Sequence, residues 1–229
     1  MRLTNFGVLA ALSLMLAGVN PLPAQVQRPQ PPQNARFLVL VDAAHGGDDA
    51  GGKLGNGMPE KSWTLAYAQR LRSLLAARGM QVSLTRSTDL NLAPNERAGM
   101  ANHMQPQACI IVHATESGSG IHLFVSSLSP QQSAKLMPWR TIQAAEVPRS
   151  IALAGQINSA LTHAGVPVSM TRTSLAVVDS MACPAVAIEL APLNAAGKQS
   201  AAALDDKDYL ARSAEAIAAA LVAWRAEVR

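Results

Sequence analysis

Two short apolar runs constrain the fold of this 229-residue chain most, because neither alternates with polar residues. They are FLVLV at residues 37–41 and ACIIV at residues 108–112. A strand with one face in water usually alternates, whereas a strand covered by helices on both faces reads as continuously apolar. We therefore expect both runs to be central strands of a parallel sheet.

Segments with apolar residues at helical spacing lie between the strands. We expect helices at residues 61–78, 92–102, 150–164 and 208–225. We expect further strands at residues 80–84, 121–125, 175–178 and 185–190. The alternation predicts an α/β fold, a three-layer sandwich with a mostly parallel central sheet flanked by helices.

The amino-terminal region carries the features of an export signal. Arg2 precedes an apolar run at residues 6–19, which is too short to span a bilayer comfortably. Residues 1–24 are therefore predicted to be a signal peptide, with an uncleaved anchor as the alternative. Residues 25–36 are rich in Gln and Pro and predict a linker, which leaves residues 37–229 as one folded domain. We expect a protein exported to the periplasm or cell envelope, and free of the membrane once the signal is removed.

Composition limits the partners of this chain. The net charge is +4, the aromatic content is 3%, and there is no run of Lys and Arg, which argues against a nucleic-acid partner. We expect a monomer. In an oxidising compartment Cys109 and Cys183 could pair, but we favour two buried thiols because both lie at apolar runs.

The glycine-rich stretch after the first apolar run allows two interpretations. Residues 47–53 spell G-x-x-x-x-G-K, the beginning of a phosphate-binding loop. Leu54 stands where that loop needs a hydroxyl for Mg²⁺, and Asp48 and Asp49 would repel a phosphate. We therefore favour a metal site over a nucleotide site.

The metal interpretation rests on the ends of three expected strands. His45, His113 and Glu189 each come at or shortly after such an end, where open α/β sheets bind their ligands. Glu60, at the beginning of the next helix, is the best third ligand beside the two histidines. His45, Glu60 and His113 would hold a catalytic Zn²⁺, and Glu189 would be the general base. His103, His122 and His163 are expected to be surface or structural residues.

Several motifs resemble the zinc-dependent N-acetylmuramoyl-L-alanine amidases, which cut peptidoglycan. The motifs are VDAAHGGDDAGG, EKSWTLAYAQRL, VSLTRSTD, ERAGMAN, IIVHAT and CPAVAIELAPLN, and the resemblance covers residues 37–223. The resemblance implies zinc ligation by His45, Glu60 and His113, with Glu189 as the catalytic residue. It also implies cleavage of the amide between the lactyl group of N-acetylmuramic acid and L-alanine.

The chain departs from the family pattern at Ala44, Thr115 and Pro192, where the family usually has Gly, Asn and Phe. These departures leave open a second function. The chain would then be a catalytically weak or inactive protein on the same scaffold, with a peptidoglycan-binding or regulatory role. A zinc peptidase acting on proteins is a third. Arg86 and Arg97 match family positions. They could serve either in a structural ion pair or in contact with substrate. Whether an activator protein is needed also stays open. Residues 129–149 could form a gate over the site or a surface connection.

Overall fold

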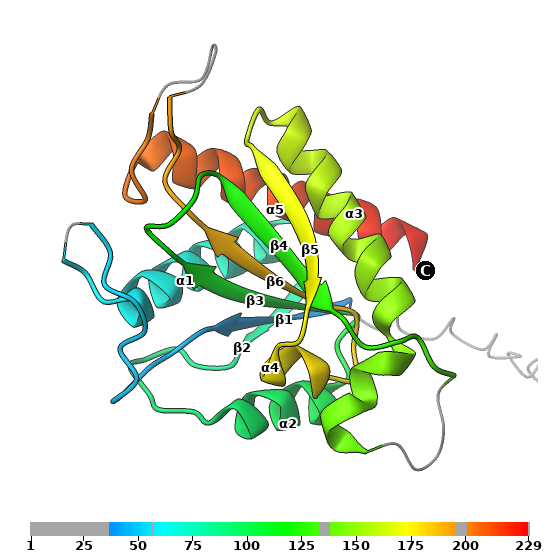
Figure 1. Cartoon of the computed structure of the whole chain (residues 1–229). Helices are drawn as coiled ribbons and strands as arrows, with labels where there is room; N and C mark the ends of the chain where they lie inside the picture. Colours follow the sequence, from blue (N-terminus) through cyan, green and yellow to red (C-terminus); the bar gives the residue numbers. More distant parts are fainter. Residues whose placement is uncertain (1–36, 56, 133–137, 196–200, 229) are drawn as a thin grey trace, which may run out of the picture. The chain divides into compact units, whose positions relative to one another are not determined.

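The computed structural model describes residues 37–55, 57–132, 138–195 and 201–228. Within these ranges six strands form one sheet in the order β2-β1-β3-β6-β4-β5 (Figure 1). The strands are β1 (Leu38–Ala43), β2 (Gln81–Leu84), β3 (Ala108–Ala114), β4 (Ile121–Ser126), β5 (Val168–Thr173) and β6 (Ala185–Leu190). All neighbouring strands pair in parallel except β4 and β6, which are antiparallel.

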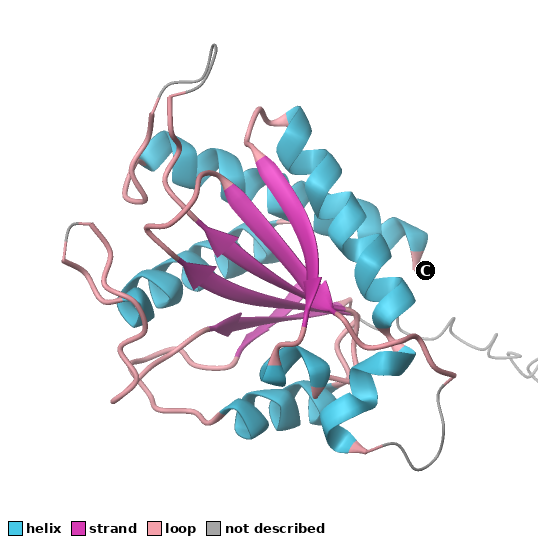
Figure 2. Cartoon of the chain, viewed as in Figure 1, coloured by secondary structure: helices cyan, strands magenta, loops and turns pink. Residues whose placement is uncertain are grey.

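Helices lie on both faces of this sheet (Figure 2), which confirms the predicted α/β sandwich. One face packs against α1 (Glu60–Ala77), α3 (Val147–His163) and α5 (Lys207–Glu227). The other face packs against the shorter helices α2 (Pro94–Met104) and α4 (Ala176–Asp179). In the described ranges no helix has the length and apolar character that crossing a membrane requires.

The central strands are buried on both faces, as their composition predicts. In β1, Val39 and Val41 pack toward the long helices, whereas Leu40 packs toward the short ones. In β3 the same division separates Ile110 from Ile111. Successive side chains of a strand point to opposite faces, so a strand covered on both faces is apolar along most of its length.

Helix α1 positions the beginning of the site. Trp63, Tyr67, Leu71 and Leu75 are buried at a spacing of four residues and form one apolar face. The helix begins at Glu60, directly after Pro59, whose extended backbone excludes an earlier start. An acidic first residue suits the positive end of the helix dipole.

One predicted strand is wrong, and one strand was not predicted. Residues 175–178 were expected to form a strand but lie at the N-cap and in the single turn of α4, since four apolar residues fit either element. The neighbouring strand is β5, whose sequence VSMTRT is mostly exposed at the sheet edge and therefore lacks an apolar signal.

The two cysteines form a disulfide, so the favoured interpretation of two buried thiols is wrong. Cys109 of β3 and Cys183, just before β6, have Cα atoms 6.3 Å apart and close a loop across 74 residues of sequence. Both side chains are buried between the sheet and the short helices. The disulfide therefore links β3, which carries His113 near its end, to the beginning of β6, which carries Glu189 near its end.

The segment at residues 129–149 is described only in part, because residues 133–137 lie outside the described ranges. Its second half contains the 3-10 helix η1 (Trp139–Ala145), which leads into α3. Gln143 is fully buried and its Nε2 donates hydrogen bonds to the carbonyls of Val178, Met181 and Cys183. The Ser150 hydroxyl in turn donates to Gln143 Oε1. These buried bonds argue against a lid built from residues 143–149.

Candidate metal centre

His45 lies two residues beyond β1 in a backbone conformation that is rare for a residue with a side chain. Its φ is 63°, in the left-handed region, and such a residue costs roughly 1–3 kcal/mol unless its surroundings hold it. Its Nδ1 contacts Asp49 Oδ2 at 2.8 Å, and its Nε2 contacts Glu60 Oε2 at 3.1 Å. The imidazole is therefore fixed between two carboxylates.

Glu60 joins both histidines of the site. Its Oε1 lies 2.9 Å from Nδ1 of His113, and its Oε2 lies 3.1 Å from Nε2 of His45. The carboxylate also accepts hydrogen bonds from the backbone N–H groups of Gly52 and Ala114. The side chain is 7% exposed, so all of its partners are protein groups at close range.

Electrostatics in the cluster favour a cation. Burial raises the pKa of the Glu60 carboxyl, but hydrogen bonds from His113, His45 and the two backbone groups outweigh burial and lower it well below its ordinary value. The hydrogen bond to Glu60 is the main cause that raises the pKa of His45. An imidazole can donate from both nitrogens only when it is protonated, so a positive charge is favoured between these groups.

The donor atoms themselves fit a divalent metal. One ligand atom from each of His45, Glu60 and His113 lies within 4.8 Å of the other two. Two imidazoles and a carboxylate are a common protein ligand set for catalytic zinc. Asp49 adds the carboxylate that often holds the second nitrogen of a metal-binding histidine. The three residues that the sequence predicted are therefore brought together by three separate elements.

Glu189, the predicted base, lies beside the cluster on β6. It is paired in register with His113 of β3, so both side chains project from the same face of the sheet. Its carboxylate Oε2 lies 3.1 Å from Nδ1 of His122, and the side chain is 31% exposed. A cavity of about 160 Å³ is lined by His45, Asp49, Arg97 and His113 among others, but not by Glu189.

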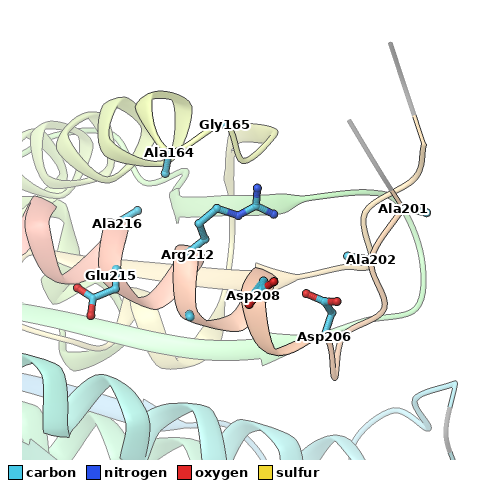
Figure 3. A pocket seen from close by; sticks show the side chains of 10 residues that line it. Ala164, Gly165, Ala201, Ala202, Asp206, Asp208, Arg212, Glu215 and Ala216 are labelled. Carbon is cyan, nitrogen blue, oxygen red and sulfur yellow. The ribbon is translucent and has the colours of Figure 1, made fainter. Parts of the chain in front are cut away.

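A larger cavity lies elsewhere. It has a volume of about 1040 Å³ and is lined by the beginning of α5 and the end of α3 (Figure 3). Two of its charged residues have structural partners, since Asp206 caps α5 and Glu215 pairs with Arg78. No histidine or cysteine lines it, so we place the site at the smaller cavity.

Comparison with known proteins decides the family. A family model described as N-acetylmuramoyl-L-alanine amidase matches residues 39–223. This chain belongs to that family. An amidase of this name from Mycobacterium tuberculosis is 29% identical over 210 residues, which cover 80% of this amidase and 82% of the relative.

Solved structures agree on the fold. The catalytic domain of an amidase from Bacillus (Paenibacillus) polymyxa var. colistinus is 26% identical, with a TM-score of 0.62, covering 82% of this amidase and 98% of that chain. An amidase from Mycobacterium smegmatis, 20% identical, matches with a TM-score of 0.65 and covers 83% of this amidase and 97% of that chain. At that lower identity the likeness supports the fold alone.

Both arginines of the amidase motifs make structural contacts. Arg97 Nη1 pairs with Asp42 Oδ1 at 2.7 Å, and its Nη2 donates to the His45 carbonyl at 2.7 Å. Arg86 donates to the carbonyls of Ala43 and Ala44 and is also buried. The two guanidinium groups thus bind the backbone that carries His45. The sequence shows the arginines but not this role, because carbonyl partners leave no pattern.

The departures from the family pattern lie outside the three-residue cluster. The Thr115 hydroxyl accepts a hydrogen bond from the Ser117 N–H, and the Pro192 carbonyl accepts one from Gly120. The Ala44 carbonyl is bound by Arg86 and by Thr64. In the described ranges these residues shape the loops around the site, and the predicted ligands keep their geometry.

Two residues near the amidase site were missed or misread in the sequence. Asp49 entered only as a charge that argues against phosphate, although it holds His45. His122 was expected to be a surface or structural residue, but it contacts Glu189. The contact of His122 with Glu189 can be inferred only once β4 is known to pair antiparallel with β6.

Proposed function

We propose that this amidase hydrolyses the amide bond between N-acetylmuramic acid and L-alanine of peptidoglycan with a zinc ion held by His45, Glu60 and His113. The observation that carries the proposal is the convergence of the three ligand atoms within 4.8 Å. When bound there, zinc polarises a carbonyl oxygen and lowers the pKa of water.

The residues of the chain supply the remaining functions. Glu60 and the two histidines orient one another, because the carboxylate contacts both rings. Glu189, adjacent to His113 in register, takes a proton from the attacking water and delivers it to the leaving amine nitrogen. The Glu189 side chain is 31% exposed, so water can approach its carboxylate.

The proposal extends to location and partners. The signal-like residues 1–24 lie outside the described ranges, and a wall substrate supports export to the periplasm or cell envelope. A family structure from Clostridioides difficile shows an amidase in complex with a lipoprotein. We propose that an accessory protein acts on this amidase as well, which co-purification from envelope extracts would test.

A defined muropeptide tests the reaction. We expect mass spectrometry to show a free amino-terminal L-alanine peptide and an intact sugar lactyl acid, formed by the zinc-loaded protein and not after chelation. Glu189→Gln should retain zinc yet lose nearly all activity, since an amide side chain cannot accept the proton. Stoichiometric zinc without cleavage would instead support the regulatory function, and cleavage of peptides lacking the sugar would support a peptidase.

A further inference from the structure

His122 and Glu189 face each other across the antiparallel pair of the sheet. Their Cα atoms are partners in the register of β4 with β6, and Glu189 is also the partner of His113 in the register of β6 with β3. Directly paired residues project from the same face of a sheet, with Cβ atoms about 4.5–5.5 Å apart. His113, Glu189 and His122 therefore form one row across three strands, and the proposed metal ligand lies at one end.

The two side chains contact each other directly. His122 Nδ1 lies 3.1 Å from Glu189 Oε2, and the side chains are 25% and 31% exposed. In the described ranges, His122 is the sole side chain with a hydrogen bond to this carboxylate. Without it, the Glu189 side chain would have only its own rotamer preferences and water to set its direction.

The surroundings of His122 hold its ring in place. Gly118 has φ = +86°, and a Cβ added there would lie 2.7 Å from Cε1 of His122. The loop after β3 therefore packs its backbone directly on the ring, which a larger residue at position 118 would prevent. On the strand, Phe124 contacts the same ring edge to face, with centroids 6.4 Å apart.

We propose that His122 is a positioning residue that holds the Glu189 carboxylate in the orientation that accepts the proton from water. The inference rests on the proposed function of Glu189. The Nδ1–H group donates to Oε2, which leaves Oε1 free to face the cluster and take the proton. Because a carboxylate is acceptor-only when ionised, this contact requires the proton on Nδ1 of His122. The imidazole acts through Glu189 and does not touch the scissile bond.

Three substitutions test this role. His122→Leu removes the donor, whereas His122→Asn retains an N–H donor near the position of Nδ1. We expect His122→Leu to lower kcat about tenfold to hundredfold at unchanged KM and zinc content, because the base is misdirected. His122→Asn should recover most of kcat. His103→Leu, the same change at an exposed residue of α2, should match the wild type.

Two results would overturn the proposal. One is a kcat for His122→Leu within twofold of the wild type, and the other is an Asn variant that is as slow as the Leu variant. If the zinc-loaded wild type itself does not cleave the muropeptide, the proposed function fails rather than this inference.

Nuclear magnetic resonance tests the contact without reference to activity, and its first measurement needs only the wild type. The ¹⁵N spectrum of the His122 ring should show the proton on Nδ1, and Glu189→Ala should shift that signal. A ring protonated on Nε2 alone, or a signal that does not respond to Glu189→Ala, would contradict the positioning role.

Discussion

Gly51 lies directly against the ring of His45. A Cβ added to Gly51 would be 2.6 Å from Cδ2 of His45 and 2.8 Å from Oε2 of Glu60, and the φ of Gly51 is +65°. A side chain at this position would push apart two of the proposed ligands. The glycine-rich character of the loop is thus a steric requirement of the cluster.

Gly51→Ala should lower zinc affinity by tenfold or more. The added methyl group collides with His45 and Glu60, and the left-handed backbone is itself unfavourable for alanine. Gly52→Ala is the matched control, because its Cβ would lie 3.4 Å from Glu60 Oε2 and its backbone is not left-handed. Competition with a chelating dye measures both affinities. Equal losses in the two variants would contradict this packing argument.

Asp49→Asn should weaken zinc binding by about tenfold to hundredfold, the usual effect of removing the carboxylate behind a metal-binding histidine. Asp49 contacts Nδ1 of His45 at 2.8 Å and thereby fixes Nε2 toward Glu60. The exposed neighbour Asp48 has no such contact, so Asp48→Asn should bind zinc as the wild type does. Isothermal titration of both variants checks the difference, which would vanish if Asp49 were only a surface charge.

Arg97→Met should destabilise the fold by about 3–5 kcal/mol, because it leaves the buried Asp42 carboxylate without its ionic partner. The substitution also removes the donors to the carbonyls of Ala43 and His45. Chemical denaturation of the zinc-free protein measures the change. Arg72→Met at an exposed position of α1 should stay within about 0.5 kcal/mol of the wild type. An equally small effect of Arg97→Met would show that the Arg97–Asp42 pair contributes little to stability.

Replacing Cys109 and Cys183 together by alanine should lower the free energy of unfolding by about 2–5 kcal/mol. The disulfide closes a loop spanning 74 residues of sequence and so restricts the unfolded chain strongly. The proposed zinc ligands are held by contacts other than the disulfide, so zinc stoichiometry should not change in the folded variant. Thermal unfolding of the wild type with and without reductant provides a second test, in which an unchanged midpoint would contradict a structural disulfide.

The gathering of His45, Glu60 and His113 was predictable from the sequence, because strand ends are visible in it. The continuous apolar runs of β1 and β3 place His45 and His113 at one sheet edge, and Glu60 follows from its place at a helix beginning. Residue contacts that depend on pairing direction were not predictable. His122 became a partner of Glu189 only through the antiparallel register, and β5 was missed because an exposed edge strand carries no apolar run.

The most direct test of zinc binding by this cluster is anomalous diffraction at the zinc edge from crystals of the zinc-loaded protein. We expect one strong peak bonded to Nε2 of His45, Nδ1 of His113 and a Glu60 carboxylate oxygen, at about 2.0–2.2 Å from each. No peak at this cluster, or a peak bound by other residues with these three side chains apart, would contradict it.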